Sequence, residues 1–338
     1  MNAPPTRHDI TLITDEVGVC AVSSIKGLKP GNPNWINQDN FFLIDNHSKP
    51  PSSSGATSLI PSTIACVFDG HGEHGHLVSR RCRELLPIIL QNTGYDLMKS
   101  FMMIQNDLTS CDIDTRCSGA TCNMVLHVHA PLHASNANYG RLIIANCGDS
   151  RCVLGKKLSN GNYAPVQLSN DHKPDNPDER KRVIAAGGHL GCRQALVNQG
   201  SRGMVSVPVG PTRVWYQYKG DTLGLAMSRS LGDSVVHRFG VSAEPEITEY
   251  HLTETDEFVI LASDGIWDVV DNNQAIQVIQ NFISRGNPTS WDQLEAAVWL
   301  TKFARARWEK MSAMIDDITC VVMKVKGGDT GIGMTKHR

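Results

Sequence analysis

Runs of apolar residues that stop at turn residues alternate along this chain with longer amphipathic stretches. The short runs predict strands at residues 17–24, 40–44, 64–68, 121–129, 141–147, 152–154, 164–168, 246–250, 258–262 and 319–326. Apolar positions at helical spacing predict helices at residues 76–90, 95–108, 176–186, 273–284 and 291–310. Strands followed by a helix pair, in two successive rounds, indicate antiparallel sheets covered by helices, which is an α+β layered fold.

The stretch at residues 189–220 breaks this order. It has little periodicity and holds many Gly, Gln and Arg residues, so we interpret it as an excursion from the core. The 338 residues are many for one domain, yet a large two-sheet fold reaches this size. We therefore predict an N-terminal lead at 1–16, a single domain at 17–326 that includes the excursion, and a C-terminal tail at 327–338.

Composition excludes several classes of protein. The formal net charge is −2 and the basic residues are interspersed with acidic ones, so no basic field favours nucleic acid or an anionic membrane. The ten cysteines are scattered without a Cys-x-x-Cys pair, which is typical of reduced thiols. No apolar stretch is long enough to span a bilayer, and the N-terminus lacks a signal core. We expect a monomeric protein of the cytoplasm or nucleus.

Two Asp-Gly pairs directly follow predicted core strands. Asp69-Gly70 follows the run 64–68, and Asp264-Gly265 follows the run 258–262. A buried carboxylate needs a partner, and neither motif contains Lys or Arg. A hard cation shared by both aspartates is the simplest compensation.

Further aspartates border other predicted strands, namely Asp39, Asp149, Asp268 and Asp316. An all-oxygen ligand set favours Mg²⁺ or Mn²⁺ over zinc or copper. Two such ions about 3.5 to 4 Å apart would activate water and clamp a phosphoryl group. Simpler interpretations stay open at this point: Asp149 is as readily a turn residue, Asp39 a solvated one, and Asp317 a charge at a strand edge.

Three histidines follow closely after the first Asp-Gly pair in the sequence. His71, His74 and His76 follow no zinc-site spacing, and the glycines between them disfavour a rigid cage. We interpret His74 and His76 as solvated loop residues. His71, close to Asp69, is placed to give a proton to a leaving oxygen. The sequence contains no Cys-x5-Arg loop, nucleotide-binding Gly-x4-Gly-Lys-Ser/Thr loop, Gly-x-Ser-x-Gly elbow or His-Glu-x-x-His helix.

Taken in order, eight segments of the chain resemble the metal-dependent serine/threonine protein phosphatase family, type 2C. Together they lie within a span from Val17 to about Val325. The segments are 37–39 (Asn-Gln-Asp), 67–72 (Val-Phe-Asp-Gly-His-Gly), 118–121 (Ser-Gly-Ala-Thr), 145–151 (Ala-Asn-Cys-Gly-Asp-Ser-Arg), 168–174 (Leu-Ser-Asn-Asp-His-Lys-Pro), 225–233 (Leu-Ala-Met-Ser-Arg-Ser-Leu-Gly-Asp), 261–268 (Leu-Ala-Ser-Asp-Gly-Ile-Trp-Asp) and 316–319 (Asp-Asp-Ile-Thr).

The resemblance implies a four-layer α-β-β-α sandwich of two antiparallel sheets flanked by helix pairs, with a metal centre at one end between the sheets. It implies that Asp69 bridges two Mg²⁺ or Mn²⁺ ions. The carbonyl of Gly70 would lie on one ion, with Asp264 and Asp316 on the other.

The resemblance also assigns roles around those ions. Asp149 and Asp268, together with Asp264, match positions that hold a weaker third ion. Asp39 would hold metal-bound water, and His71 matches the general acid. The implied reaction is direct attack of metal-activated water on phosphoserine or phosphothreonine in phosphoprotein substrates, without a phosphoenzyme.

The chain departs from the family pattern at two positions. Animal members have an Arg that grips substrate phosphate where this chain has Asn34, and Gln38 replaces a Glu. The excursion at 189–220 corresponds to the family's variable flap beside the active site. Its candidates for substrate contact are Arg193, Arg202 and Arg213.

Two alternatives to a protein phosphatase remain open at this point. A non-catalytic descendant of the fold would bind a partner through the flap, and its support is the missing Arg at Asn34. The candidate ligands Asp69, Asp264 and Asp316 argue against it, because a binding module has no need of them. The other alternative is a metal-dependent hydrolase of small phosphoesters.

Overall fold

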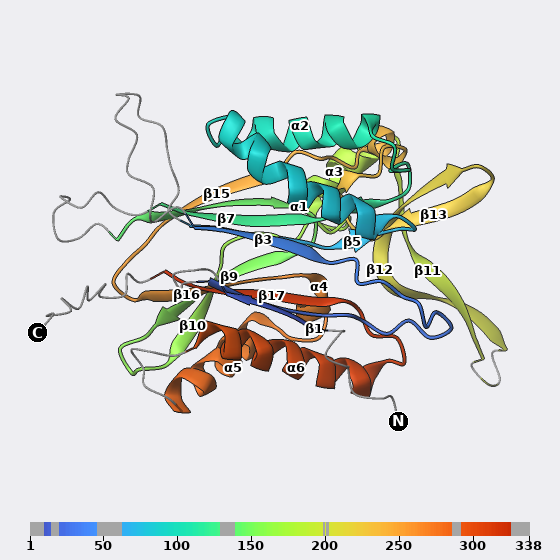
Figure 1. Cartoon of the computed structure of the whole chain (residues 1–338). Coiled ribbons are helices and arrows are strands. Elements are labelled where there is room, and N and C mark those ends of the chain that lie inside the picture. Colours follow the sequence, from blue (N-terminus) through green and yellow to red (C-terminus); the bar gives the residue numbers. More distant parts are fainter. Residues whose placement is uncertain are drawn as a thin grey trace, which may run out of the picture.

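The structure is a computed structural model that describes residues 10–14, 20–45, 63–128, 139–198, 200, 203–285 and 292–325. Two antiparallel sheets lie face to face, and a pair of helices covers the outer face of each (Figure 1). The layers therefore run helix, sheet, sheet, helix. This arrangement confirms the predicted fold class.

The six-stranded sheet has the order β1-β2-β17-β16-β9-β10, and its neighbouring strands are antiparallel. Because β1 pairs with β2, the sheet begins within the segment 1–16 that the sequence predicts to be a lead. The predicted tail at 327–338 lies outside the described residues. The strands are β1 (Ile10–Thr14), β2 (Cys20–Ile25), β17 (Ile318–Lys324), β16 (Asp256–Ala262), β9 (Arg151–Lys157) and β10 (Tyr163–Gln167).

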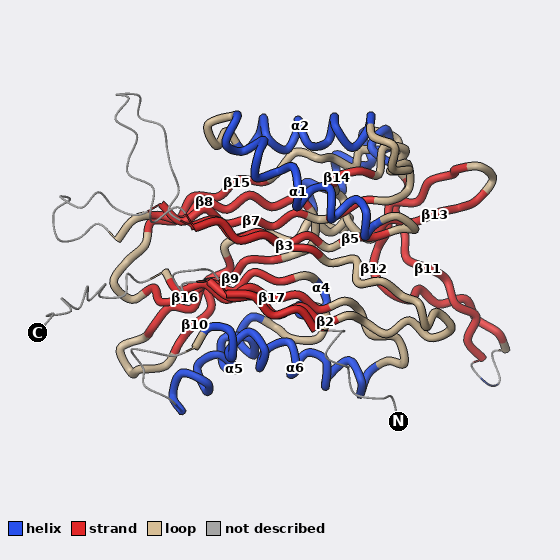
Figure 2. Tube along the Cα trace, viewed as in Figure 1, coloured by secondary structure: helices blue, strands red, loops and turns tan. Residues whose placement is uncertain are grey.

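The five-stranded sheet has the order β15-β8-β7-β4-β3, again antiparallel (Figure 2). Along β4, Ile64, Cys66 and Phe68 pack toward the helices, while Ala65 and Val67 pack toward the other sheet. Both faces are covered, so the strand reads as a continuous apolar run. The strands are β15 (Glu246–His251), β8 (Arg141–Cys147), β7 (Cys122–Val128), β4 (Thr63–Phe68) and β3 (Asn40–Asp45).

Amphipathic helices form the outer layers. In α2, Leu97, Phe101, Ile104 and Leu108 share one buried face that packs on the five-stranded sheet. Its N-terminus is capped by Asp96, whose side chain accepts a hydrogen bond from the backbone of the first turn. The five-stranded sheet carries α1 (Gly75–Asn92) and α2 (Leu97–Ser110), and the six-stranded sheet carries α5 (Asn272–Arg285) and α6 (Gln293–Met311). None of the helices among the described residues is long and apolar enough to cross a membrane.

The excursion predicted at 189–220 is a small sheet of its own, which we call the flap sheet. It consists of β11 (His189–Asn198), β12 (Met204–Tyr218) and β13 (Asp221–Leu225), and it projects from one end of the sandwich (Figure 1). Much of β11 and the first half of β12 is exposed, so these strands lack the buried alternation that reveals a strand in sequence. Shorter elements near this end are β5 (Gly70–His71), β6 (Gly119–Ala120), β14 (Leu231–Gly232), α3 (Pro177–Ala185), α4 (Asp264–Trp267) and a 3-10 helix (Val236–Phe239).

Candidate metal centre and active site

Strand register brings carboxylates from both sheets to one end of the sandwich. Asp69 follows β4 and Asp39 precedes β3, and these strands pair Phe68 with Asn40. Asp264 follows β16 and Asp316 lies just before β17, in the sheet that pairs Ala262 with Cys320. The antiparallel pairing therefore places strand ends that are far apart in sequence next to one another. The flap sheet projects from the same end.

The backbone at Asp69 is fixed from both sides. Its N–H donates to the hydroxyl of Thr121 at 3.0 Å, and its carbonyl accepts from the Thr121 N–H at 2.8 Å. A Cβ on Gly70 would lie 2.5 Å from the carbonyl oxygens of Gln38 and Gly75. Only glycine allows this close approach, so the Asp-Gly pair is more than a turn signal.

The second Asp-Gly pair is held by the neighbouring strand. Asp264 begins the short helix α4, and Ser263 alone separates it from the end of β16. A Cβ on Gly265 would lie 1.9 Å from the carbonyl oxygen of Asp317, which precedes β17. The backbone between the two sheet strands is thus packed too tightly for any residue except glycine at position 265.

Burial and mutual repulsion act on these carboxyl groups together. Burial raises the pKa of Asp69 well above its usual range, and the nearby Asp264, Asp39 and Asp316 raise it further. Burial likewise raises the pKa of Asp264, with Asp149 as its strongest repulsive neighbour. Such a cluster calls for positive charge.

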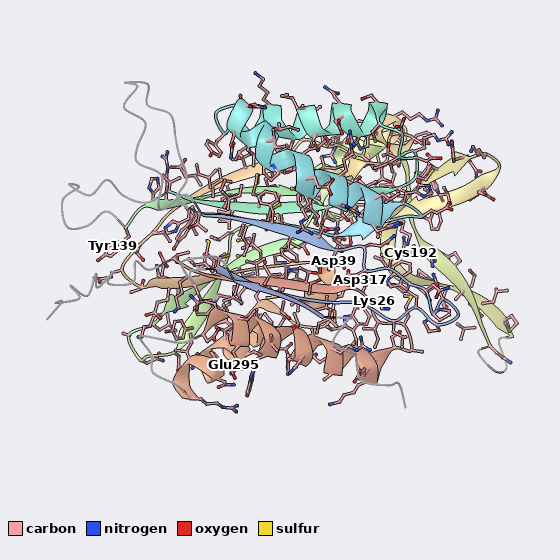
Figure 3. All side chains as sticks on the ribbon, viewed as in Figure 1. Lys26, Asp39, Tyr139, Cys192, Glu295 and Asp317 are labelled. Atoms are coloured by element: carbon pink, nitrogen blue, oxygen red, sulfur yellow. The ribbon has the colours of Figure 1, made fainter. Side chains whose placement is uncertain are left out.

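Asp39 and Asp317 lie at this end of the sheets (Figure 3). Burial, with repulsion from Asp317, raises the pKa of Asp39 to about 8. Its Oδ2 accepts a hydrogen bond from Ser263 at 2.8 Å, and its Oδ1 is buried without a hydrogen-bond partner among the described residues. Asp39 is buried, so the interpretation as a solvated residue is wrong.

Asp316 and Asp317 have different roles. Asp317 accepts hydrogen bonds from the backbone of Gly27 and Gln38 and from the indole of Trp35, so it ties down the loop before β3. It is buried, which makes the interpretation as a strand-edge charge wrong. Asp316 instead pairs with Lys29, whose ammonium lies 2.7 Å from Oδ1.

Asp149 and Asp268 lie around a second lysine. Lys173 donates to Asp149 at 2.5 Å, and the buried Oδ1 of Asp149 has no partner among the described residues. Burial lowers the pKa of Lys173, but Asp149 and Asp264 outweigh it and raise the pKa. Burial raises the pKa of Asp268 to about 6. Asp149 is therefore a buried ion-paired residue and not a simple turn.

The carboxylates at this end of the sandwich are the kind of ligand that a hard divalent cation prefers. The donor set consists of carboxylate oxygens and contains no thiol, and two of these oxygens are buried with no hydrogen-bond partner in the part of the chain that the structure describes. Within the described residues, no three acidic, histidine or cysteine side chains are grouped closely enough to hold a metal ion as they stand. Lys29 and Lys173 supply the compensating charge in this arrangement. A metal that binds Asp316 or Asp149 would therefore displace a lysine.

His71 pairs with a residue for which no role is predicted from sequence. Its Nε2 lies 2.6 Å from Oδ2 of Asp233, which also accepts a hydrogen bond from Ser230 at 2.7 Å. Burial lowers the pKa of His71, but Asp233 outweighs it and raises the pKa. A Cβ on Gly119 would lie 2.3 Å from Oδ2 of Asp233, which explains the glycine there. Asp233 ends the segment 225–233 that resembles the family pattern, but nothing in the sequence of that segment indicates that its partner is His71.

Two of the three predicted flap arginines lie near this centre. Arg193 and Arg213 line a cavity of about 370 Å³ together with His71 and Asp233. Arg202 lies outside the described residues. Figure 3 shows Cys192, the neighbour of Arg193 in sequence, near the end of the flap sheet that lies next to the sandwich.

The model of the protein phosphatase 2C family matches residues 36–311. Probable protein phosphatase 2C 64 of Oryza sativa subsp. japonica is 35% identical over 86% of this chain and 63% of its own length. Probable protein phosphatase 2C 41 of Arabidopsis thaliana is 33% identical over 77% of this chain and 73% of its own length. The chain belongs to the protein phosphatase 2C family.

Solved structures show the same fold. A serine-threonine phosphatase 2C from Toxoplasma gondii has a TM-score of 0.64 at 19% identity and covers 95% of this chain and 96% of its own. A C. elegans sex determining protein has a TM-score of 0.64 at 19% identity, over 91% of this chain and 65% of its own. These comparisons confirm the predicted family, and the rice and Arabidopsis relatives named above are protein phosphatases. The match spans less than two thirds of the rice relative's length.

Proposed function

We propose that this chain hydrolyses phosphoserine and phosphothreonine in proteins with the help of Mg²⁺ or Mn²⁺. The observation that carries the proposal is the cluster of buried, mutually repelling carboxylates beside the His71–Asp233 pair, on the fold of the protein phosphatase 2C family. Divalent cations bound there would activate water and neutralise the phosphoryl oxygens. We propose two such ions, with a third as a weaker site.

We propose a separate role for each residue of the candidate metal centre. Asp69, the Gly70 carbonyl, Asp264 and Asp316 would hold the two ions, and Asp39 would orient the attacking water. His71 would donate a proton to the seryl or threonyl oxygen as it leaves. Asp149 and Asp268 would hold the third ion.

Lys29 is the cation that we propose for the phosphate, in the absence of an arginine at Asn34. Its ammonium lies at the acidic cluster and 5.0 Å from the ring centroid of Trp35, which limits its movement. Trp35 is itself held by Asp317. With Asp316 holding a metal ion, the ammonium would be free to pair with a dianionic phosphoryl group.

Phosphate release from a phosphothreonine peptide with millimolar Mn²⁺ tests the proposal. We expect activity in the wild type and its loss in Asp69→Asn and in Asp264→Asn. A wild type that releases no phosphate would favour a binding module instead. Turnover restricted to small phosphoesters would favour a small-molecule hydrolase.

A further inference from the structure

A cavity of about 370 Å³ opens between the candidate general acid and the flap sheet. His71 and Asp233 line one side, and Arg193, Arg213 and Trp215 line the other. A substrate bound for attack beside His71 therefore has this cavity within reach. None of the roles proposed above for residues of the metal centre involves this cavity.

Arg213 is built into the cavity wall. Its Nη1 donates to the carbonyl of Gly224 on β13 at 2.8 Å. A Cβ on Gly224 would lie 2.8 Å from the ring of Trp215 and 3.1 Å from Cδ of Arg213, so both side chains lie across this glycine. The Arg213 guanidinium is thus held by packing as well as by a hydrogen bond.

The Nε of Arg213 is buried and has no hydrogen-bond partner among the described residues. An unsatisfied buried donor is unfavourable by about 1 to 3 kcal/mol, and more when it is charged. Burial lowers the pKa of Arg213, and the nearby positive charge of Arg193 lowers it further. An anion bound between or beside these two guanidinium groups would relieve their repulsion.

Few acidic residues line the cavity itself, although Asp149 of the neighbouring carboxylate cluster is close enough to act on Arg213. The sequence contains no Asp or Glu from Arg180 to Gly220, a stretch that includes β11 and most of β12. Among the residues that line the cavity, Asp233 is acidic, and it is already paired with His71 and Ser230. The cavity therefore has an excess of positive charge that no lining residue balances.

We propose that this cavity is a subsite for a second anionic group of the substrate, close in sequence to the residue that is dephosphorylated. The proposal rests on the proposed function and deepens it. Guanidinium groups suit carboxylate and phosphate oxygens, which they bind in a bidentate manner. An extended peptide advances by about 3.3 to 3.6 Å per residue, so the group would lie within about three residues of the phosphorylated one. Trp215 offers an apolar wall to the side chain between them.

The test uses phosphothreonine peptides that carry Ala, Glu or phosphoserine at each position within three residues of the phosphothreonine. We expect the wild type to prefer an anionic residue at one position, by about tenfold in kcat/KM. The Arg193→Gln/Arg213→Gln variant should lose this preference, so that its kcat/KM for the anionic peptides equals its own kcat/KM for the Ala peptide. Arg141→Gln, on β8 and paired with Glu249, is the control and should keep the preference.

Equal kcat/KM for all peptides, or a preference that survives in the double variant, would overturn the proposal. A response to Glu and phosphoserine alike would identify a general anion subsite, and a response to phosphoserine alone a phosphate subsite. Fluorescence anisotropy of the same peptides in EDTA separates the subsite from catalysis. If no peptide is hydrolysed, the proposed function fails. The subsite then fails as well if the wild type and the double variant bind the anionic peptides equally in the anisotropy measurement.

Discussion

The ammonium group of Lys29 lies 2.7 Å from Oδ1 of Asp316, the carboxylate proposed to hold a metal ion. Lysine and metal therefore compete for one oxygen. Removal of the lysine charge should tighten metal binding, since the metal then displaces nothing and meets less repulsion.

For Lys29→Met we expect the affinity for Mn²⁺ to rise by about threefold to tenfold, or about 0.7 to 1.4 kcal/mol. Isothermal titration calorimetry at pH 7 measures it directly. Lys156→Met is the matched control, because Lys156 pairs with Asp256 at the far end of the six-stranded sheet. Unchanged or weaker Mn²⁺ binding in Lys29→Met would contradict the competition.

The repulsion within the cluster predicts a stability effect at Asp264. Its pKa is raised in the folded protein because it is buried and lies near Asp149, so its ionised form is unfavourable there. Asp264→Asn should therefore raise the free energy of unfolding in EDTA at pH 7, by about 1.4 kcal/mol for each unit by which the pKa of Asp264 is raised. The stabilisation by Mn²⁺ should disappear in the same variant.

Urea denaturation with EDTA and with Mn²⁺ measures both effects. Asp256→Asn is the control on the same strand, because Asp256 is also buried but accepts hydrogen bonds from the Thr253 backbone and hydroxyl. That variant should be less stable than the wild type. An Asp264→Asn protein that is destabilised in EDTA would show that the cluster is not strained.

The His71–Asp233 pair predicts a dependence on the leaving group. Asp233→Asn should remove the charge that orients and supports protonated His71, and Asn tolerates the positive φ of 47° at this position. Turnover of a phosphoserine peptide should fall by about tenfold to a hundredfold. Turnover of p-nitrophenyl phosphate should change little, because its leaving group needs no proton.

Parallel kcat measurements on the two substrates test this expectation. Asp114→Asn removes an exposed partner of Arg116 and should leave both rates unchanged. An equal loss on both substrates in Asp233→Asn would mean that Asp233 supports the site in general and not the proton donor.

The sandwich could be predicted from sequence because both sides of its sheets are covered. Runs such as Ile64 to Phe68 are apolar at every position, and helices such as α2 have one regular apolar face. Most of β11 and the first half of β12 have no such cover, so Leu196 and Met204 are exposed and the periodicity is lost. Tertiary contacts, here the hydrogen-bonded register of β11 with β12, decide its structure.

The candidate site likewise contains residues that a local sequence signal predicts and residues that only the folded chain reveals. Asp69 and Asp264 could be predicted because an Asp-Gly pair after a core strand is a local signal. The roles of Lys29 and Asp233 depend on partners that lie 287 and 162 residues away in the chain. No local pattern indicates such a pair, and only the folded register brings the groups together.

Glu179 predicts how stability depends on pH. Burial alone would raise the pKa of this α3 carboxyl, but hydrogen bonds from Arg182, Arg229 and Ser228 outweigh it and hold the pKa well below its usual range. A depressed folded pKa means that the contribution to stability is complete above the unfolded pKa of about 4.3 and is lost as the pH falls below it. Glu179→Gln should cost about 3 kcal/mol at pH 7, because it leaves two arginines without their partner.

The difference in unfolding free energy between wild type and Glu179→Gln should therefore be constant from pH 7 to about pH 5 and shrink below pH 4. Urea titrations at pH 7, 5, 4 and 3 measure it. Glu84→Gln is the control, since Glu84 forms an exposed pair with Arg80 and should give little difference at any of these pH values. A gap that stays constant down to pH 3 would mean that Glu179 stabilises the loop around Ser228 through its shape and not its charge.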